Sequence, residues 1–206
     1  MATVVHLHGL LFSAWSLFFV AQAVLIANGR AAQHRAMRLL GDALTSAMLS
    51  VGLATAIHSA GALIAAGFGD RARGFMIVPV TTILFFAVAV TVAIANRRRP
   101  EVHKRWMLVA SIAILMAAAA RIVRFLRFGT EIPPGPPPIE TSVVPALGTD
   151  LLIVAAILYD WRSRGRPHPA YWIAGGAWLA IQLLRIPFSK TPAWQAIADW
   201  LLAFAG

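Results

Sequence analysis

The stretch FMIVPVTTILFFAVAVTVAIA, residues 75–95, is followed by Asn96 and then by the run Arg97-Arg98-Arg99-Pro100. It contains no ionisable side chain, and as a helix it is about 32 Å long, which matches the hydrocarbon core of a bilayer. In lipid each backbone polar group needs a partner within the protein, and a helix provides one. Residues 75–95 are therefore predicted to form a transmembrane helix that ends at a basic, proline-containing boundary.

The composition extends this prediction to the whole chain. Its 206 residues are 59% hydrophobic and 13% charged, with a mean hydropathy of +0.73. A soluble domain has roughly 25% charged residues, so a soluble protein is excluded. The absence of cysteine excludes disulfides and thiolate metal sites. The net charge of +10 comes from short basic clusters between apolar runs, which is typical of contact with anionic lipids rather than with nucleic acid.

Six apolar runs predict one all-α transmembrane domain over residues 1–206, built as three helical hairpins. A shorter C-terminal run, residues 193–205, places Trp194, Ile197 and Leu201 at helical spacing and is predicted to be an amphipathic helix in the membrane interface. The expected spans are residues 10–27, 39–66, 75–95, 106–128, 143–159 and 171–186.

Basic residues predict the orientation. Most of them lie in the connectors after the first, third and fifth spans, which places these connectors inside and both termini outside. In a bacterium this means a multi-pass protein of the inner membrane with periplasmic termini. The residues concerned are Arg30, Arg35, Arg38, Arg97, Arg98, Arg99, Lys104, Arg105, Arg162, Arg164 and Arg166.

The same connectors share the pattern Arg-x-x-x-His, at residues 30–34, 99–103 and 164–168. Each copy opens the second helix of an expected hairpin, so the pattern fits a threefold internal repeat. The alternative is that basic and amphipathic residues collect at the inner interface without a repeat.

Two histidines are expected at one depth. If the first hairpin turns near Gln33, then His8 lies opposite position 59, next to His58. Imidazoles on neighbouring helices at one level suit a b-type haem or a copper ion. His6 is a further metal-ligand candidate, but it points about 200° away from His8. The alternatives are an ordinary hydrogen-bonded His58 and interfacial histidines near the chain end.

Three arginines, Arg121, Arg124 and Arg185, are predicted near the same outer depth, and the first two share a helix face. Ionisable groups within a span are costly, and they indicate a function by default. The guanidiniums are therefore predicted to bind haem propionates, a quinone carbonyl or lipid phosphate. Two alternatives remain: Arg124 and Arg185 extend to the interface, or Arg121 forms a buried structural pair with Asp150.

The segment His103-Lys104-Arg105-Trp106-Met107, with the apolar residues up to Arg121, resembles an element of uncharacterised bacterial multi-span proteins. Residues 29–35, which lead into the second span, show a similar likeness. These proteins resemble, at a distance, the b-type cytochrome and ferric reductase transmembrane group. The resemblance covers the first four spans and implies one haem at most, because the four well-embedded histidines of a two-haem cytochrome are missing.

These observations predict a membrane protein with an outer-leaflet site that holds one b-type haem or a metal ion, acting in electron transfer, with quinone as a possible partner, or in cofactor handling. No catalytic sequence motif assigns an enzymatic reaction. The alternative is a non-catalytic accessory subunit of a larger membrane complex, because glycine- and alanine-rich helix faces favour close packing. A transporter is a third possibility, supported by the repeat and by Asp150.

Overall fold

The computed structural model describes residues 2–131 and 133–205, and every regular element in these ranges is a helix. The predicted all-α class is thus confirmed for the described chain. Four segments are long and apolar enough to cross a membrane. They are Thr3–Ala27, Arg38–Ala95, Pro100–Phe128 and Ile139–Arg164.

The chain divides into two compact units, residues 1–55 and 56–206. The first unit contains α1 (Ala2–Ala27), the short α2 (Ala31–Ala36) and most of α3 (Arg38–Leu63). Within it, α1 and α3 approach closely at Gly41, where a Cβ atom would lie 3.1 Å from Cε1 of Phe18.

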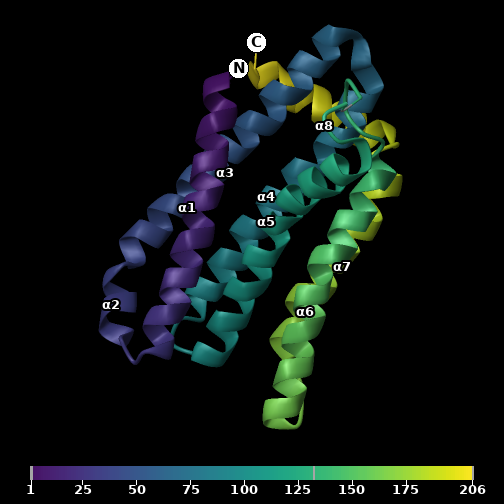
Figure 1. The fold of residues 1–206 in the computed structure, drawn as a ribbon. Helices are drawn as coiled ribbons and strands as arrows, with labels where there is room; N and C mark the ends of the chain where they lie inside the picture. The colour runs from purple at the N-terminus through teal and green to yellow at the C-terminus, as the bar shows by residue number, and fades with distance from the viewer. Residues whose placement is uncertain (1, 132, 206) are drawn as a thin grey trace. The chain divides into compact units, whose positions relative to one another are not determined.

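The second unit contains the end of α3 and the remaining helices, which are coloured from blue through teal and green to yellow in Figure 1. A π-helical turn, Ile64–Phe68, joins α3 to α4 (Gly69–Ala95), and the chain bends at Gly67, which has a φ of 90°. The apolar segment Arg38–Ala95 is therefore two helices separated by a kink. The other elements are α5 (Pro100–Phe128), the 3-10 turn η2 (Ile139–Ser142), α6 (Val143–Arg164), α7 (Pro169–Phe188), α8 (Pro192–Leu202) and the 3-10 turn η3 (Ala203–Ala205).

Helix α5 is central to the second unit, because it contacts α4, α6 and α7. It runs beside α4 (Figure 1), and both helices carry fully buried alanines. Small side chains let helix backbones approach closely, which replaces the hydrophobic effect as the source of packing energy in lipid. Fully buried alanines on these helices are Ala89, Ala93, Ala110 and Ala113.

Candidate functional site

A polar face of α7 lies inside the second unit. Trp178, Gln182 and Arg185 follow one another at helical spacing, so their side chains share one face. Their exposed fractions are 0%, 5% and 2%. A glutamine and an arginine are therefore held in the interior of a predicted membrane domain, where polar groups indicate a functional site by default.

Arg185 has fewer hydrogen bonds than its guanidinium offers. Its Nη2 donates to Ser142 Oγ at 3.1 Å and to Met116 Sδ at 3.4 Å. Its Nε and Nη1 are buried, and neither has a hydrogen-bond partner among the described residues. Each unsatisfied buried donor costs about 1–3 kcal/mol, and more when it is charged. Two donors of Arg185 are therefore left for an acceptor that the described residues do not supply.

A carboxylate lies close to this guanidinium. Gln182 Nε2 donates to Asp150 Oδ1 at 3.1 Å, and Asp150 is half-buried on α6. Asp150 and Arg185 interact electrostatically, but no ion pair within 4.0 Å joins these two described residues. We call Ser142, Asp150, Gln182 and Arg185 the α7 polar cluster. It contains one positive and one negative group, so its formal charge is zero.

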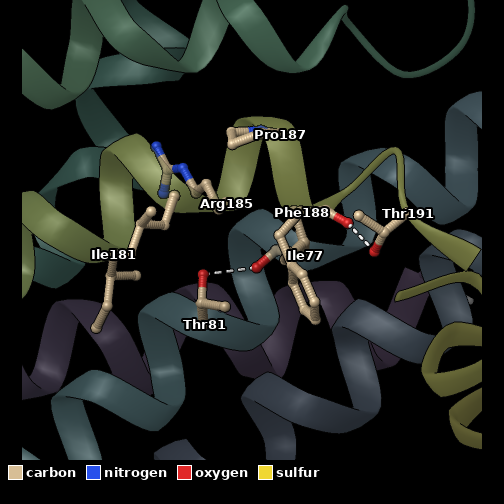
Figure 2. Close-up of a pocket in the computed structure, with 8 residues that line it drawn as sticks. Ile77, Thr81, Ile181, Arg185, Pro187, Phe188 and Thr191 are labelled. Carbon is tan, nitrogen blue, oxygen red and sulfur yellow. Dashed lines mark hydrogen bonds between the residues drawn. The ribbon is translucent and has the colours of Figure 1, made fainter. Parts of the chain in front are cut away.

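An apolar groove of about 550 Å³ adjoins the cluster at the end of α7 (Figure 2). Its uncharged polar members are Thr81 and Thr191, whose hydroxyls donate to the backbone carbonyls of Ile77 and Phe188 at 2.7 Å. Arg185 contributes to the wall, and Figure 2 shows its guanidinium extending away from Ile77 and Phe188. The groove is thus a hydrocarbon surface beside the polar cluster, suited to an apolar chain.

The structure separates the three arginines predicted from the sequence. Arg121 is exposed and donates to the carbonyl of Ala117 at 3.4 Å. Arg124 Nη2 donates to the carbonyl of Pro133 at 2.6 Å. Arg185 alone of the three is buried. A shared role as ligands stays a prediction for Arg121 and Arg124.

Two alternatives from the sequence are wrong. Arg185 does not extend to the interface, because it is 2% exposed. The pair between Arg121 and Asp150 does not form either, because Asp150 accepts from Gln182 instead. The depth count placed Asp150 and Arg121 within reach of each other, but helix rotation decides which side chain faces the carboxylate.

The histidines occupy different settings. His6 is exposed, and His8 is half-buried with its ring 4.1 Å from that of Phe12. His58 is exposed on α3. His8 and His58 belong to different compact units, so their joint role as ligands stays a prediction. Among the described residues, no group of three or more histidines and carboxylates is placed to hold a metal ion.

A charged network that was not predicted from the sequence lies at the other end of the same helices. Arg105 is 1% exposed and donates to Asp160 through Nε at 2.8 Å and Nη2 at 2.7 Å. Its Nη1 donates to Glu101 Oε2 at 2.6 Å, and the ring of Tyr171 lies 5.5 Å from the guanidinium carbon. Arg164 forms an ion pair with the same glutamate. Arg105 was counted among the basic connector residues that set the orientation, and in the structure its charge is buried and fully paired.

The histidines of two copies of the Arg-x-x-x-His pattern, His103 and His168, make different hydrogen bonds. His103 Nδ1 donates to the carbonyl of Ala93 at 2.9 Å, whereas His168 Nδ1 accepts from the backbone N–H of Ala170 and caps α7. Burial and the neighbouring charge of Arg105 lower the pKa of His168, which favours the neutral form that the cap requires. The sequence similarity therefore does not extend to the hydrogen bonds of these two histidines.

Comparison with known proteins adds no assignment. No protein family, curated protein or solved structure matches this chain.

Proposed function

We propose that this chain is an integral membrane protein that binds the head group of a lipophilic, carbonyl-bearing ligand of the quinone class at the α7 polar cluster. The observation that carries the proposal is the buried guanidinium of Arg185, two of whose nitrogens have no partner among the described residues. A guanidinium only donates hydrogen bonds, so the ligand must present an oxygen with free lone pairs.

The charge of the cluster favours a neutral ligand. Arg185 already interacts with the carboxylate of Asp150, so a phosphate or a carboxylate would add a second negative charge where only one positive charge is available. Two like charges close together in a poorly solvated site repel each other strongly. A quinone carbonyl accepts hydrogen bonds without adding charge, and the neighbouring apolar groove suits an attached hydrocarbon chain.

Binding of a decyl-tailed benzoquinone to the purified protein in detergent tests the proposal. The titration is followed by quenching of tryptophan fluorescence, because Trp178 lies beside Gln182 and Asp150. Arg185→Met keeps an unbranched stem and removes the hydrogen-bond donors, so we expect the Kd to rise about tenfold or more. Arg121→Met, at an exposed arginine, is the matched control and should leave the Kd unchanged. Equal affinity of the wild type and Arg185→Met overturns the proposal.

A second proposal is one b-type haem or copper ion bound by His8 and His58, in a protein that transfers electrons in a bacterial inner membrane. It is supported by the expected common depth of the two imidazoles and by the distant resemblance to b-type cytochromes. The environment of His58 supports it as well. No hydrogen bond or ion pair of the His58 imidazole occurs among the described residues, which leaves its ring nitrogens available to a metal. The imidazoles would supply the axial ligands, and the haem would supply the electron chemistry.

An absorbance spectrum of the purified protein tests this second proposal. We expect a Soret band that is absent from His58→Ala and retained in His34→Ala, whose histidine lies on the short helix α2. A colourless and metal-free preparation overturns it. Co-purification of other subunits with such a preparation, together with no quinone binding, would instead support the accessory-subunit alternative.

A further inference from the structure

A second cavity, of about 510 Å³, lies where three segments of the second unit meet. Its walls come from the start of α4, from the proline-rich run that enters η2, and from the α7–α8 connection with the first turn of α8. None of its lining residues belongs to the α7 polar cluster. The residues that define its chemistry are Asp70, Arg71, Glu140, Lys190, Ser189 and Gln195.

The proline-rich wall is fixed in place. Proline restricts φ, so this run loses little entropy when it is ordered. Gly135 has a φ of 86°, and a Cβ atom there would lie 2.5 Å from Cε1 of Phe68, so only glycine fits. Arg71 Nη2 donates to the carbonyl of Pro136 at 2.9 Å. The cavity is therefore a built feature of the fold rather than a gap under a loose loop.

The opposite wall is attached to α4 in a similar way. Trp194, which is 3% exposed, donates through Nε1 to the carbonyl of Arg73 at 2.9 Å. Arg73 Nε also pairs with Asp199 at 2.6 Å. These contacts hold the first turns of α8 against α4, so the side chains of α8 that face the cavity keep a fixed position.

The rim of the cavity carries both signs of charge. Lys190 Nζ and Glu140 Oε1 are 2.9 Å apart, with side chains 66% and 55% exposed. An exposed pair of this kind contributes about 0–1 kcal/mol, so its members exchange partners at little cost. Asp70 and Arg71 add one further charge of each sign.

The side-chain amide of Gln195 has a buried oxygen that accepts no hydrogen bond from the described residues. Its Nε2 donates to the carbonyl of Ser189 at 3.1 Å, and because only the amide nitrogen can donate, this bond fixes the orientation of the amide. Its Oε1 is buried and has no hydrogen-bond partner among the described residues. A ligand with an N–H donor would satisfy it.

We propose that this cavity binds a zwitterion that joins a primary ammonium to a phosphate, the chemistry of a phosphoethanolamine group. The ammonium donates to Gln195 Oε1 and to the carboxylate of Glu140. The phosphate accepts hydrogen bonds from Lys190 and Arg71. In the bound state Lys190 thus pairs with the phosphate and Glu140 with the ammonium, in place of the Lys190–Glu140 pair of the free protein. The ligand carries one positive and one negative charge, and the cavity rim offers opposite charges to both of them. This site does not depend on the proposed quinone site.

The unaltered protein gives the first test. Native mass spectrometry in detergent compares the binding of phosphatidylethanolamine and of phosphatidylcholine with the same acyl chains. A quaternary ammonium has no N–H to donate to Gln195, so we expect the ethanolamine lipid to bind about tenfold more tightly. Competition by soluble O-phosphoethanolamine would assign the free head group as a sufficient ligand. Selectivity without competition would assign the intact lipid. Equal binding of the two lipids overturns the proposal.

Two variants locate the binding. Gln195→Leu removes the acceptor and should abolish the preference for ethanolamine over choline, whereas Gln33→Leu, at an exposed glutamine of the first unit, should keep it. Lys190→Met, at an exposed position, should weaken the binding of both lipids, because it removes a hydrogen-bond donor to the phosphate. A preference that survives in a folded Gln195→Leu protein contradicts the proposed site.

Discussion

Two buried arginines allow a matched test of the proposed site. Arg105 and Arg185 are 1% and 2% exposed and lie in the same unit. Methionine at either position keeps an unbranched, apolar side chain and removes the guanidinium. We expect Arg105→Met to destabilise the fold severely and Arg185→Met to leave the free energy of unfolding unchanged or higher, because the two guanidiniums differ in how well they are paired.

For Arg105 the magnitude follows from what the substitution leaves behind. The carboxylate of Asp160 is 3% exposed and accepts two hydrogen bonds from Arg105, at 2.8 and 2.7 Å. Removing the guanidinium leaves this charge buried and without its main partner, which costs about 3–5 kcal/mol. Replacing both residues, as Arg105→Met with Asp160→Leu, should recover most of the loss.

For Arg185 the two contributions have opposite signs. The substitution removes the hydrogen bond to Ser142 and a weak contact with Met116, together worth about 1 kcal/mol. It also removes two buried nitrogens without partners, each of which costs about 1–3 kcal/mol. Asp150 keeps its hydrogen bond from Gln182. These contributions give a gain of about 1–5 kcal/mol. The lost attraction between Arg185 and Asp150 reduces it, so the expected result is no change or a gain.

Equilibrium unfolding in mixed micelles of increasing sodium dodecyl sulfate fraction, followed by tryptophan fluorescence, measures both variants against the wild type without added ligand. A loss for Arg185→Met as large as that for Arg105→Met would mean that Arg185 is a structural partner of Asp150. That result would refute the argument that an external acceptor completes its hydrogen bonding.

Three further predictions concern two helix caps and the proline-rich run. Because the pKa of His168 is lowered below its ordinary value of 6.5 by burial and by Arg105, its cap on α7 is intact above pH 6.5 and is lost as the pH falls through the lowered pKa. Thermal unfolding should show this acid sensitivity in the wild type and not in His168→Asn, which caps without titrating. Gly135→Ala should lower stability by about 1–3 kcal/mol in the same assay, because the new methyl group overlaps the ring of Phe68. Thr191→Ala should cost about 1 kcal/mol through loss of the α8 cap, and an unchanged melting temperature would contradict that role.

The helices followed from the sequence because composition and chain breaks specify them locally. Each predicted apolar run lies mainly or wholly within an observed helix. Several helices begin earlier than their runs: α1 begins at Ala2 and α5 at Pro100. Prolines and glycines explain most boundaries: Pro100 and Pro169 open α5 and α7, and Gly165 closes α6 in a left-handed conformation. The chain bends at Gly67, next to the predicted end of the second span at residue 66. The helical conformation of residues 69–74, which were expected to be a connector, was not predicted.

The site was predicted in part, and helix rotation explains the difference. The cost of a charge in lipid identified Arg185 and Asp150 as candidates from sequence alone. Their neighbours Gln182 and Ser142 were missed, because uncharged polar residues are common in membrane helices. Arg105 was misjudged because an arginine at a span end usually extends into water, and its partner Asp160 is 55 residues away in the chain.

The polar side chains of α7 support its proposed role in ligand binding. It is as long as a membrane span and lies between α6 and α8 in the chain, yet it is not among the segments apolar enough to be identified as spans. Gln182 and Arg185 contribute to that difference, and both are buried. A helix required only for packing would be more stable in lipid with apolar side chains at these positions. Burial alone does not indicate a ligand, since Arg105 is buried and fully paired. The indication comes from burial combined with unfilled hydrogen bonds, and of these two arginines only Arg185 has both.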